Sequence, residues 1–276
     1  MDAVRHFLTR YEQTREDELS IEEYLDACKR DPLVYATAPE RMLVAIGEPE
    51  LLDTRHDQRL SRIFGNKVIK IYPAFRDFYG LEEPIEQVVS YFRHGAQGLE
   101  ERKQILYLLG PVGGGKSSIA ERLKHLMQQV PFYALKDSPV NESPLGLFNA
   151  AEDGELLHSQ YGIAPRYLER VMSPWAVKRL EEYGGDIRRF RVVKRFPSVL
   201  RQIAIAKTEP GDENNQDISS LVGKIDIRRL ETFAQDDTDA YSYSGGLCLA
   251  NQGLLEFVEM FKAPIKVLHP LLTATQ

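Results

Sequence analysis

Apolar positions near the start of the chain recur at helical spacing. Ser20 and Glu23 have the spacing of a capping box, which is typical of a helix N-terminus. The stretch that follows places four apolar residues at i, i+3, i+4 and i+7, namely Ile21, Tyr24, Leu25 and Cys28. This pattern predicts a helix with one buried face. Thr37 and Glu40 repeat the capping-box spacing, and we expect a second short helix over 37–46.

Later stretches alternate between strand-like and helix-like patterns. The run 68–72 is short and apolar and indicates a strand, and apolar residues over 81–92 follow a helical stripe. The apolar runs 104–109 and 131–135 predict two further strands, the first of them buried in a parallel sheet. A helical stripe after Lys116 lies between these two runs. Together they predict a β-loop-α-β unit with a right-handed crossover.

Composition and charge narrow the class of protein. The chain has 276 residues, of which 43% are hydrophobic and 28% charged. These values are those of an ordinary soluble globular protein and exclude a disordered chain, a collagen and a disulfide scaffold. With 35 basic and 41 acidic residues, the net charge is −6. A net acidic chain has no general attraction to nucleic acid or to an anionic membrane.

The cysteines and the length of the apolar runs predict the cellular compartment. The two cysteines, Cys28 and Cys248, lie far apart in the sequence and form no metal-binding spacing. This usage is typical of the reducing cytoplasm. We see no apolar run approaching the 18 or so residues that a membrane-spanning helix needs. The sequence therefore predicts a cytoplasmic protein without a membrane segment.

The sharpest motif is GPVGGGKS at residues 110–117, which satisfies the phosphate-loop pattern G-x-x-x-x-G-K-[ST]. Its glycines let backbone N–H groups wrap around an anion, and the helix that begins here adds its positive end. Lys116 brings a cation to the β- and γ-phosphates, and the Ser117 hydroxyl suits Mg²⁺. The alternative is a glycine-rich turn that binds no ligand. The predicted cofactors are ATP and Mg²⁺, and the candidate nucleotide-binding residues are Gly110, Pro111, Val112, Gly113, Gly114, Gly115, Lys116, Ser117 and Ser118.

The segments around this motif resemble a known family. FYGLEEPIEQVV at 78–89 and the Gly-Pro opening of the loop resemble AAA+ ATPases, in which a G-x-x-x-x-I-like element lies against adenine. This resemblance implies that Tyr79 and Gly80 are neighbours of the adenine. Longer phrases are similar to the PrkA family of serine protein kinases along nearly the whole chain; they are YPAFRDFYGLEEPIEQVVSYF, QILYLLGPVGGGKSS, IAIAKTEPGDENNQDISSLVGKIDIRRL and EFVEMFKAPIKVLHPLLTATQ.

The resemblance implies a fold and a domain order. We expect an α/β P-loop NTPase of AAA+ type, with a parallel sheet flanked by helices and incomplete at its C-terminus. A mainly helical segment over 1–72 precedes it, and the partial ATPase domain covers 73–276. The middle of this domain is longer than an AAA+ core needs, so we predict an insertion over roughly 150–240. Since family members continue further, the chain resembles an N-terminal fragment that lacks the arginine finger and hydrolyses ATP weakly at best.

The resemblance also implies an activity. The full protein is expected to be a cytoplasmic, ATP-dependent serine/threonine kinase that acts on a protein substrate and assembles as a homo-oligomeric ring. The first alternative is a mechanical ATPase that serves protein remodelling or ATP-dependent proteolysis, without true kinase activity. The second is a nucleotide-gated binding module without turnover. We see no conventional kinase set in this sequence, because V-A-I at 44–46 is followed by Gly47 where that set has lysine, and H-R-D and D-F-G are missing.

The Walker B position departs from the usual pattern. Aligning the A-N-x-G sequence at 250–253 puts Val258 at the metal-associated Asp and Glu259 at the catalytic Glu. Glu259 is therefore the candidate base that orients the attacking water, beside Lys116 as the second catalytic candidate. Glu256, two residues before Val258, is the candidate substitute for the missing metal partner, together with Ser117. The alternative is that both glutamates are ordinary polar residues near a strand end.

Two further features have structural interpretations. Six basic residues with interleaved aromatic residues form a cluster at Arg188, Arg189, Arg191, Lys194, Arg195 and Arg201. The cluster fits a surface for nucleic acid or an acidic partner, or else the solvated face of a strand pair or a face between subunits. The acidic chain favours the structural interpretations, so nucleic acid is not an expected partner. Trp175 is expected to pack in the core.

Overall fold

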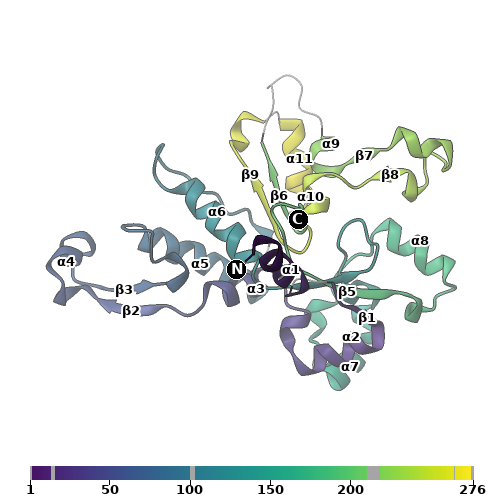
Figure 1. The fold of residues 1–276 in the computed structure, drawn as a ribbon, viewed down its shortest axis with the longest axis horizontal. Helices are drawn as coiled ribbons and strands as arrows, with labels where there is room; N and C mark the ends of the chain where they lie inside the picture. The colour runs from purple at the N-terminus through teal and green to yellow at the C-terminus, as the bar shows by residue number, and fades with distance from the viewer. Residues whose placement is uncertain (1, 14–15, 100–102, 210–217, 264, 275–276) are drawn as a thin grey trace. The chain divides into compact units, whose positions relative to one another are not determined.

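The computed structural model describes residues 2–13, 16–99, 103–209, 218–263 and 265–274. The chain divides into two compact units, and Figure 1 labels their helices and strands. The first unit contains residues 1–36 and 131–273, and the second contains 37–130 with 274–276. The second unit is therefore inserted into the first along the chain.

The first unit combines short helices with small sheets. Its helices are α1 (Ala3–Gln13), α2 (Ile21–Arg30), α7 (Ala150–Tyr161), α8 (Pro174–Glu182), α9 (Ser219–Val222), α10 (Gly246–Leu249) and α11 (Ile265–Ala274). Its strands are β1 (Glu18–Ser20), β4 (Phe132–Leu135), β5 (Arg191–Arg195), β6 (Ile205–Thr208), β7 (Lys224–Ile225), β8 (Tyr241–Ser242) and β9 (Leu254–Phe257). They pair as an antiparallel sheet in the order β1-β5-β4, a parallel pair β6-β9 and an antiparallel pair β7-β8.

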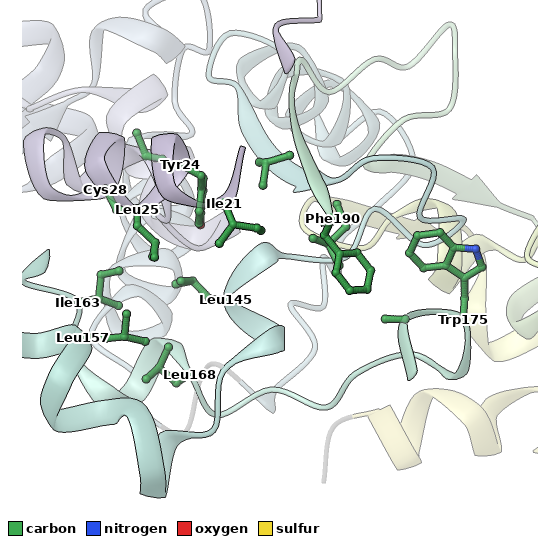
Figure 2. Close-up of a cluster of buried hydrophobic side chains, with 14 residues drawn as sticks. Ile21, Tyr24, Leu25, Cys28, Leu145, Leu157, Ile163, Leu168, Trp175 and Phe190 are labelled. Atoms are coloured by element: carbon green, nitrogen blue, oxygen red, sulfur yellow. The ribbon is translucent and has the colours of Figure 1, made fainter. Parts of the chain in front are cut away.

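The main core of the first unit lies under α2. The predicted capping box forms, since Ser20 Oγ accepts from Glu23 N at 3.1 Å and the Glu23 carboxylate accepts from Ser20 N at 2.7 Å. All four residues of the predicted stripe are buried in one cluster with Leu157 of α7, and in the same cluster Trp175 of α8 is in edge contact with Phe190 (Figure 2). The expected packing role of Trp175 is thus confirmed. Burial raises the pKa of the Cys28 thiol to about 12, so this thiol stays protonated in the core.

The second unit contains α3 (Ala38–Ile46), β2 (Glu50–Asp53), α4 (Gln58–Phe64), β3 (Val68–Ile71), α5 (Glu82–Ala96) and α6 (Lys116–Met127). The strands β2 and β3 pair antiparallel, and α3 packs against both α5 and α6. The predicted helices over 37–46 and 81–92, the helix after Lys116 and the strand at 68–72 are confirmed. The buried faces of α5 and α6 follow the predicted stripes, with Ile85, Val88, Val89, Phe92, Ile119, Leu123, Leu126 and Met127 inside.

The predicted strand over 104–109 is wrong for this structure. The segment forms no strand and pairs with none among the described residues, and Ile105 and Leu109 are 47% and 82% exposed. The run 131–135 does form β4, but β4 pairs antiparallel with β5, so the predicted β-loop-α-β unit is not formed there. An apolar run indicates that a segment tends to be buried, but it does not indicate which strand the segment pairs with. The sequence therefore predicted parallel pairing at the wrong strands.

Parallel pairing occurs instead between β6 and β9, where Ile205 lies opposite Leu254 and Thr208 opposite Phe257. The structure is thus a mixed α/β fold, and the predicted parallel sheet flanked by helices is represented by this pair alone in the described residues. The predicted sequence domains 1–72 and 73–276, with an insertion at about 150–240, stay predictions. Among the described helices, none has both the length and the apolar character needed to cross a lipid bilayer.

Candidate functional site

The glycine-rich segment 110–117 forms a tight loop that leads directly into α6. Gly113 and Gly115 have φ of 78° and 81°, in the left-handed region that side-chain-bearing residues avoid. Gly114 N donates to Pro111 O at 3.2 Å and closes the turn. Gly115 is the N-cap residue of α6, and Ile119 N donates to its carbonyl at 2.9 Å. The predicted strand that should precede this loop is absent, but the predicted loop-to-helix junction is present.

The start of α6 has the chemistry of an anion site. The first N–H groups of a helix have no partner within the helix, and a side-chain oxygen at the N-cap usually accepts one of them. Here the N-cap is glycine, no side chain caps the helix, and its first turn contains no acidic residue. The N–H groups of Lys116, Ser117 and Ser118 therefore stand at the positive end of the helix, where a phosphate fits.

Lys116 folds over its own loop. Its Nζ donates to Gly110 O at 2.7 Å and to Pro111 O at 2.6 Å. Both acceptors are neutral carbonyls, so a phosphate oxygen is a stronger partner for the ammonium group than either of them. Ser117 and Ser118 are exposed at the same helix end. The lysine and the two serine hydroxyls are thus available to an anion that enters the loop.

The segment predicted to adjoin adenine reaches this loop through Leu81. A Cβ atom built at Gly115 would lie 2.7 Å from Leu81 Cδ1, so the start of α5 packs directly on the loop. Tyr79 and Gly80 immediately precede Leu81, and Tyr79 is 82% exposed. Glu82, the next residue, has a buried Oε2 atom without a hydrogen-bond partner in the described structure. Tyr79 thus presents an exposed aromatic ring two residues before the contact with the loop, and the roles of Tyr79 and Gly80 as adenine neighbours stay predictions.

Arg122 of α6 holds the preceding segment in place. Its guanidinium donates to Ala74 O and, at 2.5 Å, to the Asp77 carboxylate, and it lies 5.2 Å from the centre of the Phe78 ring. These contacts join residues 74–78 to the helix that begins in the loop. Sequence reasoning missed Leu81 and Arg122 as positioning residues. Leu81 is 34 residues from Gly115 along the chain, and Arg122 is at least 44 residues from its partners, so no local pattern indicates these contacts.

The Walker B candidates lie in the first unit, on and after β9. Glu256 stands opposite Lys207 in the β6–β9 register, and Val258 N donates to Thr208 O at 2.9 Å. Glu259 follows the strand with φ of 51° and forms an exposed ion pair with Lys262 at 2.8 Å. The strand predicted before Glu259 is therefore confirmed, while the roles of Glu256 and Glu259 stay predictions. The described residues contain no group of three or more histidine, cysteine or acidic side chains suited to a metal.

The A-N-x-G sequence at 250–253 forms the turn before β9, and its side chains bond to β4 and to the loop after β4. Asn251 Nδ2 donates to Val140 O at 2.8 Å, and Gln252 Nε2 donates to Tyr133 O at 2.9 Å and to Asn141 O at 2.7 Å. At Gly253, an added Cβ would lie 1.6 Å from Ala204 O, so only glycine fits this close approach. Gly253 thus lets β9 lie close to β6, and Asn251 and Gln252 hold the turn before β9 against β4 and the loop that follows β4.

The predicted basic cluster is accounted for by contacts within the first unit. Each of its six members has an acidic or aromatic neighbour. The pairs are Arg188 with Asp186, Arg189 with Tyr183, Arg191 with Glu18, Lys194 with Phe196, and both Arg195 and Arg201 with Glu16. This favours the interpretation as a face of the β1-β5 strand pair. That nucleic acid is not a partner stays a prediction.

Comparison with known proteins gives consistent matches. The family model described as the PrkA AAA domain matches residues 19–276 of this chain. A protein of Escherichia coli (strain K12) named "Serine/threonine kinase YeaG" is 65% identical over 280 residues, which cover 100% of this chain and 44% of that protein. A protein of Bacillus subtilis (strain 168) named "ATP-dependent protease PrkA" is 35% identical over 286 residues, which cover 98% of this chain and 43% of that protein.

The chain thus spans less than half the length of these curated relatives. No solved structure matches it.

Proposed function

Because the chain belongs to the PrkA AAA family, we propose that it is the ATP-binding AAA+ module of a longer, cytoplasmic serine/threonine protein kinase. The observation that carries this proposal is the uncapped start of α6, where glycine takes the N-cap position and Lys116 lies over the loop. A capping side-chain oxygen would compete with a triphosphate for the helix N–H groups and an acidic first turn would repel it, and both are missing from the described start of α6.

Each residue of the site has a role in this proposal. The N–H groups of residues 112–118 surround the β- and γ-phosphates, and Lys116 leaves the carbonyls of Gly110 and Pro111 to bind the γ-phosphate. Ser117 offers its hydroxyl to the Mg²⁺ ion that accompanies ATP, with Glu256 as a more distant metal partner. Tyr79 and Gly80 adjoin the adenine. Glu259 orients the nucleophile, and in the full protein a ring of like subunits completes the site.

In the kinase reaction, the serine hydroxyl of a protein substrate releases its proton to solvent and its oxygen forms a bond to the γ-phosphorus, while the bond to the β-γ bridging oxygen breaks and ADP leaves. The printed name of the Escherichia coli relative supports this reaction. The printed name of the Bacillus subtilis relative supports a second candidate, an AAA+ ATPase that unfolds or remodels proteins for ATP-dependent proteolysis. In that case water attacks the γ-phosphate, and no protein substrate is labelled.

The test uses the full-length protein purified away from other kinases. It is incubated with γ-labelled ATP, Mg²⁺ and a generic protein substrate, beside Lys116→Ala and a matched control, Lys29→Ala. Lys29 is an exposed lysine near the end of α2. Nucleotide binding is measured for all three proteins with a fluorescent ATP analogue.

We expect Lys116→Ala to lose nucleotide binding and Lys29→Ala to keep it. Label on protein serine that is lost only with Lys116→Ala supports the kinase. Free phosphate without labelled protein, again lost with Lys116→Ala, supports the remodelling ATPase. Unchanged nucleotide affinity in Lys116→Ala contradicts the proposed site as a whole.

A further inference from the structure

An open recess lies beside α8 in the first unit. It has a volume of about 430 Å³ and is bounded on one side by α8 and on the other by the turn at 236–238. Its lining consists of Met172, Pro174, Val177, Lys178, Glu181, Asp236, Asp237 and Thr238. The volume is at the small end of the range for ligand pockets in proteins. The recess belongs to neither the glycine loop nor the Walker B candidates.

The recess combines apolar and acidic surfaces. Met172, Pro174 and Val177 supply apolar surface, and Val177 is 39% exposed. Glu181 and Asp236 are exposed carboxylates that form no ion pair or side-chain hydrogen bond with the described part of the chain. Neither carboxylate is therefore committed to holding the fold together.

The cation in the lining is already neutralised. Lys178 Nζ lies 2.6 Å from Asp237 Oδ1 and 2.7 Å from Asp239 Oδ2. The recess consequently presents the charges of Glu181 and Asp236 to a ligand. Thr238 adds a polar side chain to the lining. Its hydroxyl oxygen, Oγ1, is buried and is not exposed to a ligand in the recess.

We propose that this recess binds the arginine side chain of a peptide segment from another protein. Arginine has an apolar stem that suits Val177 and Met172, and a charged head with five N–H donors for the carboxylate oxygens of Glu181 and Asp236. Its planar head meets carboxylates in a bidentate manner, which lysine does not. Charge complementarity with Glu181 and Asp236, beside apolar surface for the stem, selects this ligand over an acidic or purely apolar one. The site works without nucleotide, so it stands or falls separately from the proposed ATP site.

The test measures peptide binding to the full-length protein without nucleotide. The probe is a fluorescein-labelled peptide of alanines and glycines with one central arginine, followed by fluorescence anisotropy. Peptides with norleucine or glutamate at the centre are compared with it. The variants are Glu181→Gln and Asp236→Asn, singly and combined, and Val177→Lys, which places an ammonium group of the protein in the recess. Glu155→Gln, at an exposed carboxylate of α7, is the matched control.

Each exposed ion pair is worth about a two- to fivefold change in affinity, so we expect the double variant to bind the arginine peptide about tenfold more weakly. Val177→Lys should weaken it similarly, and Glu155→Gln should leave it unchanged. We expect the norleucine and glutamate peptides to bind more weakly than the arginine peptide. Thermal unfolding of each variant confirms that the exposed substitutions leave the fold intact.

Two results overturn the proposal. One is equal affinity for the arginine and norleucine peptides. The other is an arginine-peptide affinity that falls as much with Glu155→Gln as with the double variant, or does not fall with the double variant at all.

Discussion

Arg122 and Asp77 are joined by a hydrogen-bonded ion pair of 2.5 Å, which ties α6 to the segment leading to the predicted adenine neighbours. The same guanidinium donates to Ala74 O. One side chain therefore links the helix that begins in the phosphate loop to the chain that precedes Tyr79 and Gly80. Arg122 therefore contributes to the site by positioning this segment and not by contacting a ligand.

We predict that Arg122→Ala lowers the free energy of unfolding by about 1–3 kcal/mol, because it removes two hydrogen bonds of a partly buried charged group. It should also weaken ATP binding, since residues 74–78 lose their attachment to α6. Arg122→Lys should recover only part of both losses, because lysine lacks the planar fork. Urea unfolding and nucleotide titration measure the two effects. Arg59→Ala, at an exposed arginine of α4, is the control and should change neither.

Gly115→Ala should damage the phosphate loop specifically. Its φ of 81° costs a side-chain-bearing residue about 1–2 kcal/mol, and the new Cβ would lie 2.7 Å from Leu81 Cδ1. We expect an ATP affinity about tenfold lower. Combining it with Leu81→Ala makes room for the Cβ but leaves the backbone strain, so the recovery should be incomplete.

Gly162→Ala is the matched control for that loop variant. Gly162 has φ of 73° at the end of α7, with open space around it. It should lower stability to a similar degree and leave nucleotide affinity unchanged. Equal loss of ATP binding in both glycine variants would show that strain anywhere in the fold, and not the loop, determines the affinity.

Glu259→Gln should separate binding from turnover. If Glu259 orients the attacking water, removing its charge lowers phosphate release by about a hundredfold or more while ATP binding persists. Lys262→Ala breaks the exposed ion pair with Glu259 and should not slow the reaction. Phosphate release and nucleotide binding are measured on the full-length protein. Turnover of Glu259→Gln at the wild-type rate would assign Glu259 to an ordinary surface position.

Glu142 predicts a pH dependence of stability. Its carboxylate is buried, and it accepts hydrogen bonds from Ser173 N at 2.6 Å and from Ser173 Oγ at 2.7 Å. Burial raises the pKa of Glu142 above its usual value of 4.5, although the Ser173 hydrogen bonds oppose the shift. The folded state therefore holds the proton more tightly than the unfolded state does, and ionisation of Glu142 favours unfolding.

The wild-type protein should thus lose stability relative to Glu142→Gln as the pH rises from about 4.5 through the raised pKa. Above that window the difference between the two should become constant. Thermal unfolding of both proteins across pH 4–8 measures it. A difference that grows in favour of the wild type with rising pH would mean that the Ser173 hydrogen bonds outweigh burial.

Local patterns predicted the helices well. The capping boxes at Ser20 and Thr37 and the apolar faces of α2, α5 and α6 are set by residues within a few positions of one another. Strand pairing was predicted poorly, because β4 takes its partner from β5, beyond two helices in the sequence. The run 104–109 has the composition of a buried strand, yet no other strand of the described chain lies beside it.

The candidate site divides in the same way. The loop itself could be predicted, since its glycines, lysine and serine occupy eight consecutive positions. The contact of Leu81 with Gly115 and the attachment of Asp77 to Arg122 join segments far apart in the sequence. Such contacts depend on how α5 and α6 pack, and no spacing rule expresses that. The side chains of Asn251 and Gln252 likewise donate to carbonyl groups that lie more than 100 residues earlier in the sequence.

The insertion of one unit within the other has a consequence for biosynthesis. Residues 37–130 emerge from the ribosome as one uninterrupted stretch, and α3, α5 and α6 find one another without any later part of the chain. The first unit has no such independence, because β1 pairs Glu18 with Val193. β1 therefore stays unpaired until β5 has been translated, and the apolar face of α2 stays uncovered until the core residues that follow from Leu135 onward have emerged. Nascent chains that are stalled before Leu135 should expose Ile21, Tyr24 and Leu25 to chaperones.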